Sequence, residues 1–348
     1  MPKQQLAAQV VVVGGGVIGL CSALSLAEAG ARVTLLERGE PGREASWAGG
    51  GILSPLYPWR GPERVWQLAA ESLALYPQLC STLGQHTGID PQWVPSGLLL
   101  LDAGEIETAA RWCRQQGLAA LEVIPQQAEP ALGSHASALA LPWVAQLRNP
   151  RLCRALLLRL QQLGVRVLTG LGHVEVESDA GRARLRAGSA VFEGDAIVIA
   201  AGAWSAQMLA ATGWNLPIAP VAGQMLLLGG AAGVLRHIVL SDGRYLIPRL
   251  DGQILVGSTV EEQGFSPHTT AGARAELLAV AVALMPDAAK LPVLAHWVGL
   301  RPGSPDGVPF IGRHPELGNL YVNAGHYRNG ITLAPASAAR LTRLICSA

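Results

Sequence analysis

The 348-residue chain has little net charge and few ionisable side chains. Charged residues make up 15% of it and hydrophobic residues 50%, and the formal net charge is +1 at pH 7. This composition argues against a disordered or fibrous protein. It also gives no electrostatic reason to expect a nucleic acid or an anionic membrane as partner. We therefore expect a well-buried enzyme that binds a small molecule.

Cysteine is scarce as well. The five cysteines are odd in number, widely separated and never in a CxxC pair: Cys21, Cys80, Cys113, Cys153 and Cys346. Neither a disulfide framework nor a zinc site is indicated by this spacing. We expect no metal, and a reducing cytoplasm fits the chain best.

No long apolar run is free of helix-breaking residues. The stretch from Val10 to Ala29 is apolar enough to suggest a membrane span, but it contains Gly14 to Gly16, Gly19 and Glu28. These residues make a poor membrane helix, so no membrane partner is expected. The length favours two domains, or one large α/β domain with an insertion.

The glycines instead follow a strand. Val10 to Val13 is a β-branched run typical of a buried parallel strand. Gly14, Gly16 and Gly19 then spell GxGxxG, in which the first glycine permits a tight turn and the second a close approach to a pyrophosphate. The third glycine allows the next helix to pack closely, and that helix presents its N-terminus to the anion.

The order of elements after the motif indicates a dinucleotide. Residues 17 to 29 should form the helix, stopped at Gly30, and residues 31 to 38 a second strand that contains Glu37. Glu37 lies about 20 residues beyond the glycines, where a carboxylate can accept hydrogen bonds from a ribose. This part of the sequence leaves NAD and FAD undistinguished.

A second glycine cluster favours a cofactor site over a linker. Gly49 to Gly51 lack side chains, so their backbone can pass against a flat ring or phosphate oxygens. Ser46 is expected to cap a short helix that faces the same pyrophosphate. A solvated linker would rarely carry the neighbouring Trp47, Ile52 and Leu53.

The rest of the chain alternates between two patterns. Residues 61 to 84 and 150 to 164 should be helices, and residues 165 to 170 a strand. Residues 173 to 187 should form an exposed antiparallel ribbon, and residues 196 to 200 should rejoin the first sheet. Short strands and irregular segments are expected from 92 to 149.

Strands dominate again from 216 to 298, with a hairpin at Asp251-Gly252 and a helix from Ala273 to Leu284. The predicted fold is α/β, with a GxGxxG FAD-binding Rossmann-like domain and an inserted antiparallel β-rich substrate domain. The expected FAD-binding domain is discontinuous and comprises residues 1–85, 150–215 and 299–348. The substrate-binding domain comprises residues 86–149 and 216–298.

Six motifs together resemble the FAD-dependent amine oxidases of the D-amino-acid oxidase class. They are VVVVGGGVIGL, Glu37, ASWAGGGIL, VIAAGAWS, GLRPGSPDGVPFIGRHP and AGHYRNGITLAPA, and they run in order from about residue 8 to the C-terminus. Because no cysteine lies near Arg301, the resemblance implies noncovalent FAD. The cofactor-binding residues that it implies are Gly14, Gly16, Val17, Ile18, Gly19, Glu37, Arg38, Ala45, Ser46, Gly50, Gly51, Ile52, Val174, Gly202, His326, Tyr327, Arg328, Asn329, Gly330, Ile331 and Thr332.

The resemblance also implies a substrate site. Arg301 would bind the substrate carboxylate as a bidentate pair, Tyr245 would donate a hydroxyl to it, and Arg328 would lie near the amino-acid end of the pocket. The helix that begins near Ile331 would point its N-terminus at the pyrimidine edge of the flavin, where reduction places negative charge. Gly243 and Val260 are small and expected near the pocket.

The implied reaction is hydride transfer from the substrate Cα to flavin N5, reoxidation by dioxygen to hydrogen peroxide, and hydrolysis of the imine to an oxo acid and ammonia. Glycine, sarcosine and small D-amino acids are the implied substrates, with a role in thiamine thiazole biosynthesis and a homo-oligomeric, tetrameric assembly. Three alternatives remain open: a D-amino-acid dehydrogenase that reduces a quinone, an inactive flavoprotein subunit, and an NAD dehydrogenase.

Overall fold

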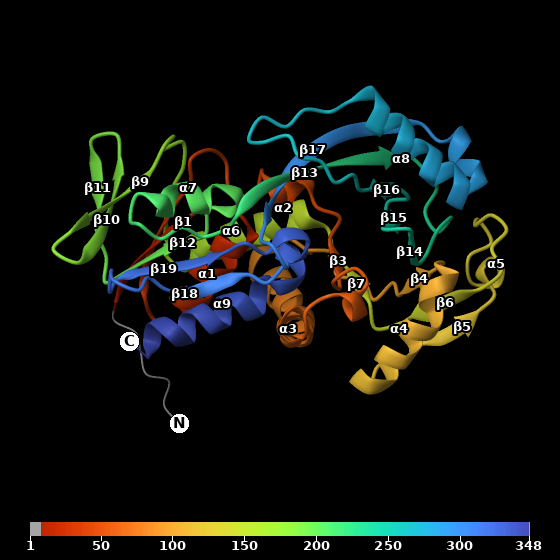
Figure 1. Cartoon of the computed structure of the whole chain (residues 1–348), viewed down its shortest axis with the longest axis horizontal. Coiled ribbons are helices and arrows are strands. Elements are labelled where there is room, and N and C mark those ends of the chain that lie inside the picture. Colours follow the sequence, from red (N-terminus) through yellow and green to blue (C-terminus); the bar gives the residue numbers. More distant parts are fainter. Residues whose placement is uncertain (1–7, 348) are drawn as a thin grey trace.

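The computed structural model describes residues 8–347, in which two large sheets lie next to each other (Figure 1). The first sheet has six strands in the order β18-β19-β12-β1-β2-β8. They span Gln9–Val13 (β1), Arg32–Leu36 (β2), Arg166–Leu168 (β8), Ala196–Ile199 (β12), Phe310–Arg313 (β18) and Leu320–Ala324 (β19). All neighbours pair in parallel except β18 with β19.

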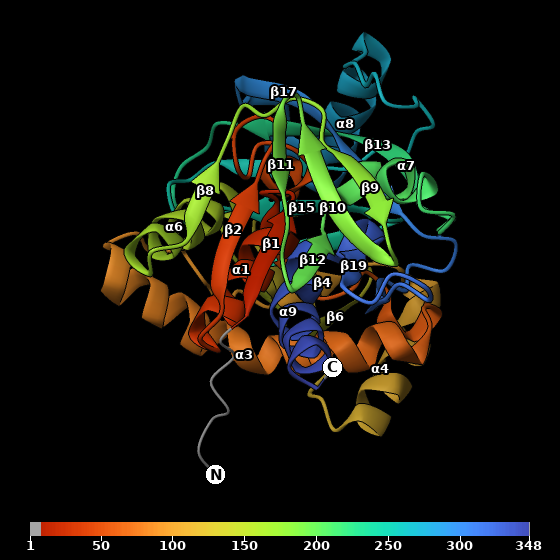
Figure 2. The same ribbon diagram turned by 90° about the vertical axis from the view of Figure 1, so that its left-hand side faces the viewer.

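This sheet follows the sequence pattern closely. The β-branched β1 is buried from Val10 to Val13 and pairs with β2 on one side and β12 on the other. The prediction that residues 196 to 200 rejoin this sheet is confirmed. Figure 2 shows β8, β2, β1, β12 and β19 lying side by side in this order.

Helices pack against this sheet, and their buried side chains form a hydrophobic core with it. They are α1 (Val17–Glu28), α3 (Glu63–Thr87), α6 (Asn149–Gln162) and α9 (Gly330–Cys346). Leucines from α1 and α6 pack with alanines of α9 and with Tyr76 of α3 in one cluster of buried side chains. A short sheet of β9 (Glu175–Asp179), β10 (Arg182–Ala187) and β11 (Ala190–Phe192) is the predicted antiparallel ribbon.

The second sheet has eight strands in the order β17-β13-β16-β15-β14-β4-β6-β5. They span Leu98–Leu100 (β4), Leu121–Val123 (β5), Ala138–Leu141 (β6), Ala219–Leu228 (β13), Ile238–Ser241 (β14), Arg244–Pro248 (β15), Ile254–Gly257 (β16) and Val293–Gly303 (β17). Only β14 and β4 pair in parallel. The hairpin at Asp251-Gly252 joins β15 to β16, as expected, and α8 (Ala271–Leu284) packs on β13 and β16.

Shorter elements complete the fold. They are α2 (Ala45–Ala48), β3 (Ile52–Leu53), η1 (Pro58–Arg60), α5 (Pro125–Ala128), β7 (Ala145–Gln146), η2 (Gly202–Trp204), α7 (Ser205–Ala210), η3 (Pro286–Lys290) and η4 (Tyr327–Asn329). The predicted α/β fold with a Rossmann-like sheet and a β-rich insertion is confirmed. Within residues 8–347, no helix is both long enough and apolar enough to span a bilayer.

Two local predictions are wrong. Residues 92 to 149 contain a 14-residue helix, α4 (Ala103–Gln116), where only strands and irregular segments were expected. This helix buries just Ala109 and Cys113, so its apolar stripe is too thin to stand out in the sequence. The apolar stretch HWVGL before Arg301 also predicted that this arginine ends a strand, but it lies inside β17, paired with Val221 of β13.

Candidate active site

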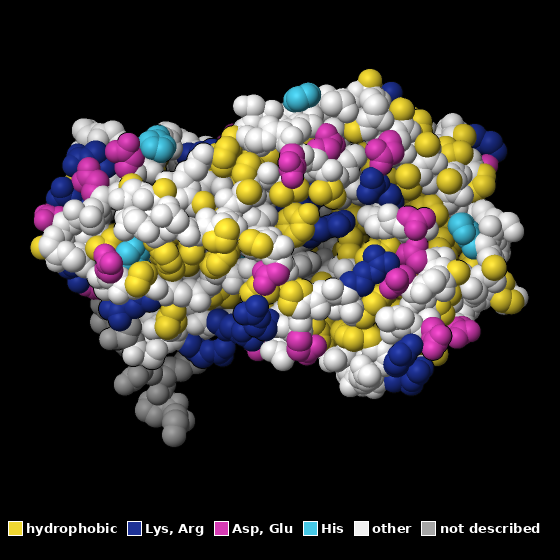
Figure 3. All heavy atoms as spheres, viewed as in Figure 1, with side chains coloured by type: hydrophobic (Ala, Val, Ile, Leu, Met, Phe, Trp, Pro, Cys, Tyr) yellow, Lys and Arg dark blue, Asp and Glu magenta, His cyan; other side chains and the backbone are white. Residues whose placement is uncertain are grey.

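A large cavity lies between the two sheets, with about 1810 Å³ of space that includes its open mouth. Its lining comes from the turn between β1 and α1, from α2, η2 and η4, and from strands β13, β15 and β17. Figure 3 shows a hollow near the middle of one face of the molecule, with Lys or Arg side chains beside it. We call the part lined by Gly14, Gly16 and Gly202 the glycine wall, and the part lined by Tyr245, Ser258 and Arg301 the arginine wall.

The turn after β1 requires glycine for steric reasons. Gly14 has a φ of +109°, and a Cβ atom there would lie 2.4 Å from the carbonyl oxygen of Ala200 on the neighbouring strand. A Cβ at Gly19 would lie 1.8 Å from the carbonyl oxygen of Gly14. Gly19 does not line the cavity, so its role here is the close packing of α1 against the turn.

Glu37 is held at the end of β2 by backbone amides. Its side chain accepts hydrogen bonds from the N–H groups of Gly15 at 2.6 Å and Gly39 at 2.8 Å. The residue is buried yet lines the cavity. A carboxylate fixed in this way can accept further hydrogen bonds from a ribose.

Ser46 plays a different part from the one predicted. The first residue before α2 is Glu44, and no side chain caps this helix. The Ser46 hydroxyl instead accepts a hydrogen bond of 2.8 Å from the N–H of Val17, so it caps α1 from outside. The prediction failed because the serine lies inside α2, where its hydroxyl reaches another helix end.

The second glycine cluster brings backbone against the β-rich sheet. A Cβ at Gly50 would lie 2.8 Å from Cδ1 of Ile247, and one at Gly51 would lie 2.2 Å from the carbonyl oxygen of Leu147. Arg249 donates a hydrogen bond of 2.7 Å to the Gly50 carbonyl, and burial lowers the pKa of Arg249 to about 10. Sequence analysis missed Arg249, which holds the backbone of the second glycine cluster in place through this hydrogen bond.

The C-terminal motif leads into a helix end at the cavity. The turn η4 precedes α9, which begins at Gly330, one residue before the predicted start. His326 is fully buried, its Nε2 lies 2.9 Å from the Ser337 hydroxyl, and burial lowers its pKa to about 3. It is therefore neutral near pH 7. Thr332 does not line the cavity, because its hydroxyl donates to the carbonyl of Ile52 at 3.1 Å.

Arg301 is a half-buried cation without a carboxylate partner. Its Nη1 donates to the Ala222 carbonyl at 3.0 Å and its Nη2 to the Ser258 hydroxyl at 2.7 Å. Among residues 8–347, no Asp or Glu forms an ion pair with it. Burial lowers the pKa of Arg301, and the positive charge of Arg328 acts in the same direction.

Tyr245 and Arg328 line the same cavity. The Tyr245 hydroxyl has only a weak partner, the Met225 sulfur at 3.5 Å, so it can turn to a better acceptor. Tyr245 comes from β15 and Arg301 from β17, two strands that are separated in the sheet by β13 and β16. The structure thus brings together the three residues that sequence analysis placed at the substrate.

Most of the predicted cofactor residues line the cavity. Besides Arg328, they are Gly14, Gly16, Val17, Ile18, Glu37, Arg38, Ala45, Ser46, Gly50, Gly51, Ile52, Val174, Gly202, His326, Tyr327, Asn329, Gly330 and Ile331. Gly243 and Val260, which were expected near the substrate, do not line it, so they do not set its size. Trp204, Gly223, Met225 and Ser258 are among the lining residues that sequence analysis missed.

Two orphaned polar atoms show that the site fits a polar ring. Nδ1 of His326 and Oδ1 of Asn323 are buried and have no hydrogen-bond partner within residues 8–347, and both residues line the cavity. Buried polar atoms without partners are rare, and a ligand is one way to satisfy them. Together with the side-chain-free glycine wall, they suit a dinucleotide that carries a heterocycle.

Comparison with known proteins agrees with this geometry. The family model described as FAD dependent oxidoreductase (DAO) matches residues 9–344. Glycine oxidase of Pseudomonas aeruginosa is 47% identical over 350 residues, which cover 97% of this chain and 94% of that protein. The bifunctional protein ThiO/ThiG of Trichormus variabilis is 31% identical, over 97% of this chain and 52% of that protein.

A solved structure is similar as well. The crystal structure of glycine oxidase from Geobacillus kaustophilus has a TM-score of 0.93 at 31% identity, over 98% of this chain and 95% of that one. The family match decides for FAD over NAD as the cofactor. The chain, an FAD-dependent enzyme, belongs to the DAO family of FAD-dependent oxidoreductases.

Proposed function

We propose that this chain catalyses the oxidative deamination of glycine, and of sarcosine and small D-amino acids, with dioxygen as the electron acceptor. For glycine, the balanced reaction consumes one dioxygen and one water and yields glyoxylate, ammonia and hydrogen peroxide. The name ThiO/ThiG of one relative supports a role in thiamine thiazole formation for the imine product. We also propose that the chain forms a homo-oligomer and works in the cytoplasm.

One observation carries this proposal. Arg301 is a half-buried guanidinium on the cavity wall, and no carboxylate of residues 8–347 forms an ion pair with it. An unpaired charge that is partly withdrawn from water is costly, so its presence favours an anion that comes with the ligand. Two of its N–H groups are occupied by Ala222 and Ser258, and the remaining ones can donate to a carboxylate.

The neighbouring side chains extend this recognition. The Tyr245 hydroxyl exchanges its weak bond to sulfur for a carboxylate oxygen, and Arg328 adds positive charge on the same cavity. The cavity-lining carboxylates of the described chain are Glu37 and Glu44, which both lie on the segment between β2 and α2. The arginine wall therefore offers no carboxylate base, and the substrate amine must lose its extra proton to solvent before it reacts.

The glycine wall suits the cofactor. Its backbone would hold the pyrophosphate, Glu37 the ribose, and the orphaned atoms of Asn323 and His326 the heterocycle. When bound, FAD supplies the two-electron acceptor for the Cα–H bond. The chain's contribution is to orient a small zwitterion by its carboxylate and to keep the site dry.

The proposal is tested with the purified holoenzyme. Peroxide and ammonia release are measured for glycine, sarcosine, D-alanine and L-alanine. We expect glycine to give equal amounts of both products, with turnover of sarcosine and D-alanine and none of L-alanine. Failure of every substrate to give peroxide would overturn the proposal. Faster turnover with a quinone analogue under nitrogen than with oxygen would instead identify a dehydrogenase.

A further inference from the structure

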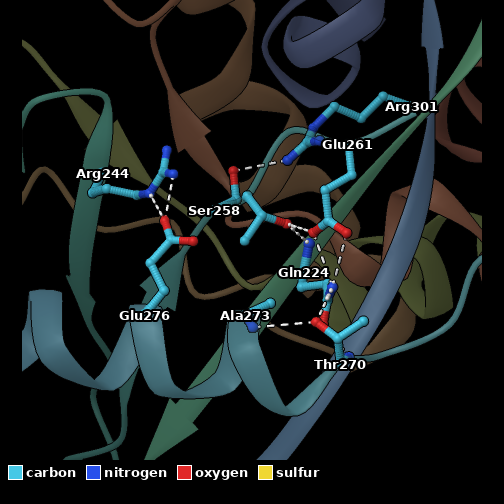
Figure 4. Close-up of polar contacts among 9 residues, drawn as sticks. Gln224, Arg244, Ser258, Glu261, Thr270, Ala273, Glu276 and Arg301 are labelled. Carbon is cyan, nitrogen blue, oxygen red and sulfur yellow. Dashed lines mark hydrogen bonds and ion pairs between the residues drawn. The ribbon is translucent and has the colours of Figure 1, made fainter. Parts of the chain in front are cut away.

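The Arg301 guanidinium lies against Gly223, between the Ala222 carbonyl and the Ser258 hydroxyl, and we call these three groups the seat of Arg301. A Cβ atom at Gly223 would lie 2.0 Å from its Nη1 and 2.1 Å from its Nη2, so the guanidinium fills the space that a side chain would need. It donates two hydrogen bonds, one to the Ala222 carbonyl in β13 and one to the Ser258 hydroxyl directly after β16. Figure 4 shows the guanidinium directed at Ser258.

Both acceptors lie beside one partly buried set of hydrogen bonds, which we call the Glu261 network: Gln224, Thr259, Glu261 and Thr270 (Figure 4). The Gln224 N–H donates to the Thr259 hydroxyl oxygen at 2.8 Å, and Gln224 Nε2 donates to both Glu261 carboxylate oxygens, at 2.9 and 3.1 Å. The Thr259 hydroxyl also donates to Glu261.

The network reaches both parts of the seat. The Glu261 N–H donates to the Ala222 carbonyl at 3.0 Å, the same oxygen that accepts from Arg301. Ser258 directly precedes Thr259, and both are buried. At its far side, Gln224 accepts from the N–H of Thr270, whose hydroxyl caps α8. The Glu261 network therefore holds the segment that carries the Ser258 hydroxyl.

The acceptor at this position is neutral, and this matters for binding. A carboxylate beside the guanidinium would pair with it and compete with an anionic ligand. A hydroxyl orients one N–H group without forming an ion pair with the guanidinium. Arg244, the other arginine in Figure 4, shows the contrast, because it is paired with Glu276 at 2.6 Å and is no candidate for ligand binding.

We infer that Ser258 is a positioning residue for Arg301: its hydroxyl holds the guanidinium on Gly223 with the remaining N–H groups free for the substrate carboxylate. This inference rests on the proposed role of Arg301 as the carboxylate anchor. A carboxylate keeps its charge throughout the reaction, so the loss of Ser258 should weaken ground state and transition state equally.

The test compares three holoenzymes: wild type, Ser258→Ala, and Ser304→Ala as the control. Ser304 is also buried and lies just after β17, but its hydroxyl has no hydrogen-bond partner within the described residues. We measure kcat and KM for glycine. We also measure the Kd of glycolate, a carboxylate that cannot be deaminated, from the change that it causes in the flavin absorbance.

Ser258→Ala should raise the KM for glycine and the Kd of glycolate by about tenfold each, the size of one lost hydrogen bond to a charged group. Its kcat should stay within about twofold of wild type, and Ser304→Ala should match wild type in all three constants. If Ser258→Ala does not fold, Ser258→Cys keeps the side-chain volume with a weaker acceptor and should raise both constants in the same direction.

Unchanged glycolate binding in the Ser258 variant, or a fall in kcat with KM preserved, would overturn the inference while leaving the proposed function intact. Wild-type enzyme that neither turns over glycine nor binds glycolate would overturn the proposed function, and this inference with it. The two failures are therefore distinguishable in one set of measurements.

Discussion

The glycine wall of the cavity consists mainly of backbone, whereas the arginine wall consists of side chains. Gly14, Gly16 and Gly202 leave main-chain atoms open to the ligand on the first. On the second, Arg301 and Tyr245 reach the cavity from separate strands of the β-rich sheet. The first wall is suited to a large cofactor such as FAD, and the second to a small substrate.

The two walls differ in what they tolerate. A backbone wall fails where an added Cβ would meet atoms that already fill the space, as at Gly14. A side-chain wall loses its affinity for the ligand when one charge is removed, and neighbouring residues can adjust that affinity. Substitutions on each wall should therefore separate cofactor binding from substrate binding.

The largest effect is expected from Arg301→Met, which removes the charge of the arginine wall and keeps a chain of similar shape. The kcat/KM for glycine should fall about 1000-fold, because the carboxylate loses a bidentate, charge-assisted partner. FAD should remain bound at wild-type stoichiometry, as measured from the visible spectrum. Wild-type turnover of glycine by this variant would remove the basis of the proposed function.

Gly14→Ala should damage the opposite wall. Gly14 has a φ of +109° and a Cβ would meet the Ala200 carbonyl at 2.4 Å, so we expect FAD loss and a destabilisation of about 2 to 4 kcal/mol. Urea unfolding and bound-FAD content provide the measurement. Gly104→Ala in α4 is the control, since nothing lies within 4 Å of its Cβ, and it should change stability by less than about 1 kcal/mol.

His326 should make stability depend on pH. Burial lowers its pKa from 6.5 to about 3, so below pH 6.5 the unfolded chain binds a proton that the folded chain does not. Its contribution is fully present above pH 6.5 and is lost as the pH falls toward 3, by up to about 1.4 kcal/mol per pH unit.

The variant His326→Gln should therefore show a shallower loss of stability between about pH 6 and pH 4 than wild type, measured by urea unfolding at several pH values. His173→Gln, whose side chain is 81% exposed, serves as the control and should keep the wild-type slope. An identical slope in the His326 variant would mean that its imidazole is not kept neutral by burial.

The smallest effect is expected from Arg244→Met. This arginine lies next to Tyr245 in the sequence, but its partner is Glu276 and both side chains are partly exposed. Its removal should change stability by less than about 1 kcal/mol and leave the KM for glycine within about twofold. A large rise in KM would show that positive charge near Tyr245, and not the seat of Arg301, determines substrate binding.

The same comparison explains what the sequence could predict. The strand, glycine turn, helix and second strand of residues 9 to 37 are set by local patterns, and their predicted bounds agree with the structure to within a few residues. The glycine wall follows from this, because the steric demands of a tight turn appear directly in the spacing of Gly14, Gly16 and Gly19. The resemblance to a known family then placed Arg301 and Tyr245.

The seat of Arg301 could not be predicted in this way. Gly223 and Ser258 are brought to the guanidinium by the pairing of β13 with β16 and β17, between segments far apart in the chain. No local pattern marks a serine as the acceptor of a distant arginine. Ser46 shows the same limit, since its position inside α2 gave no sign that it would cap α1.

Recognition of a carboxylate by an unpaired guanidinium is the central claim, and it is tested most directly by anaerobic reduction of the wild-type holoenzyme. The flavin absorbance is followed after mixing with glycine or with methylamine, which is glycine without its carboxylate. We expect glycine to bleach the flavin fully and methylamine at the same concentration to leave it oxidised. Equal bleaching by the two amines would contradict the account, because the carboxylate would then have no part in binding.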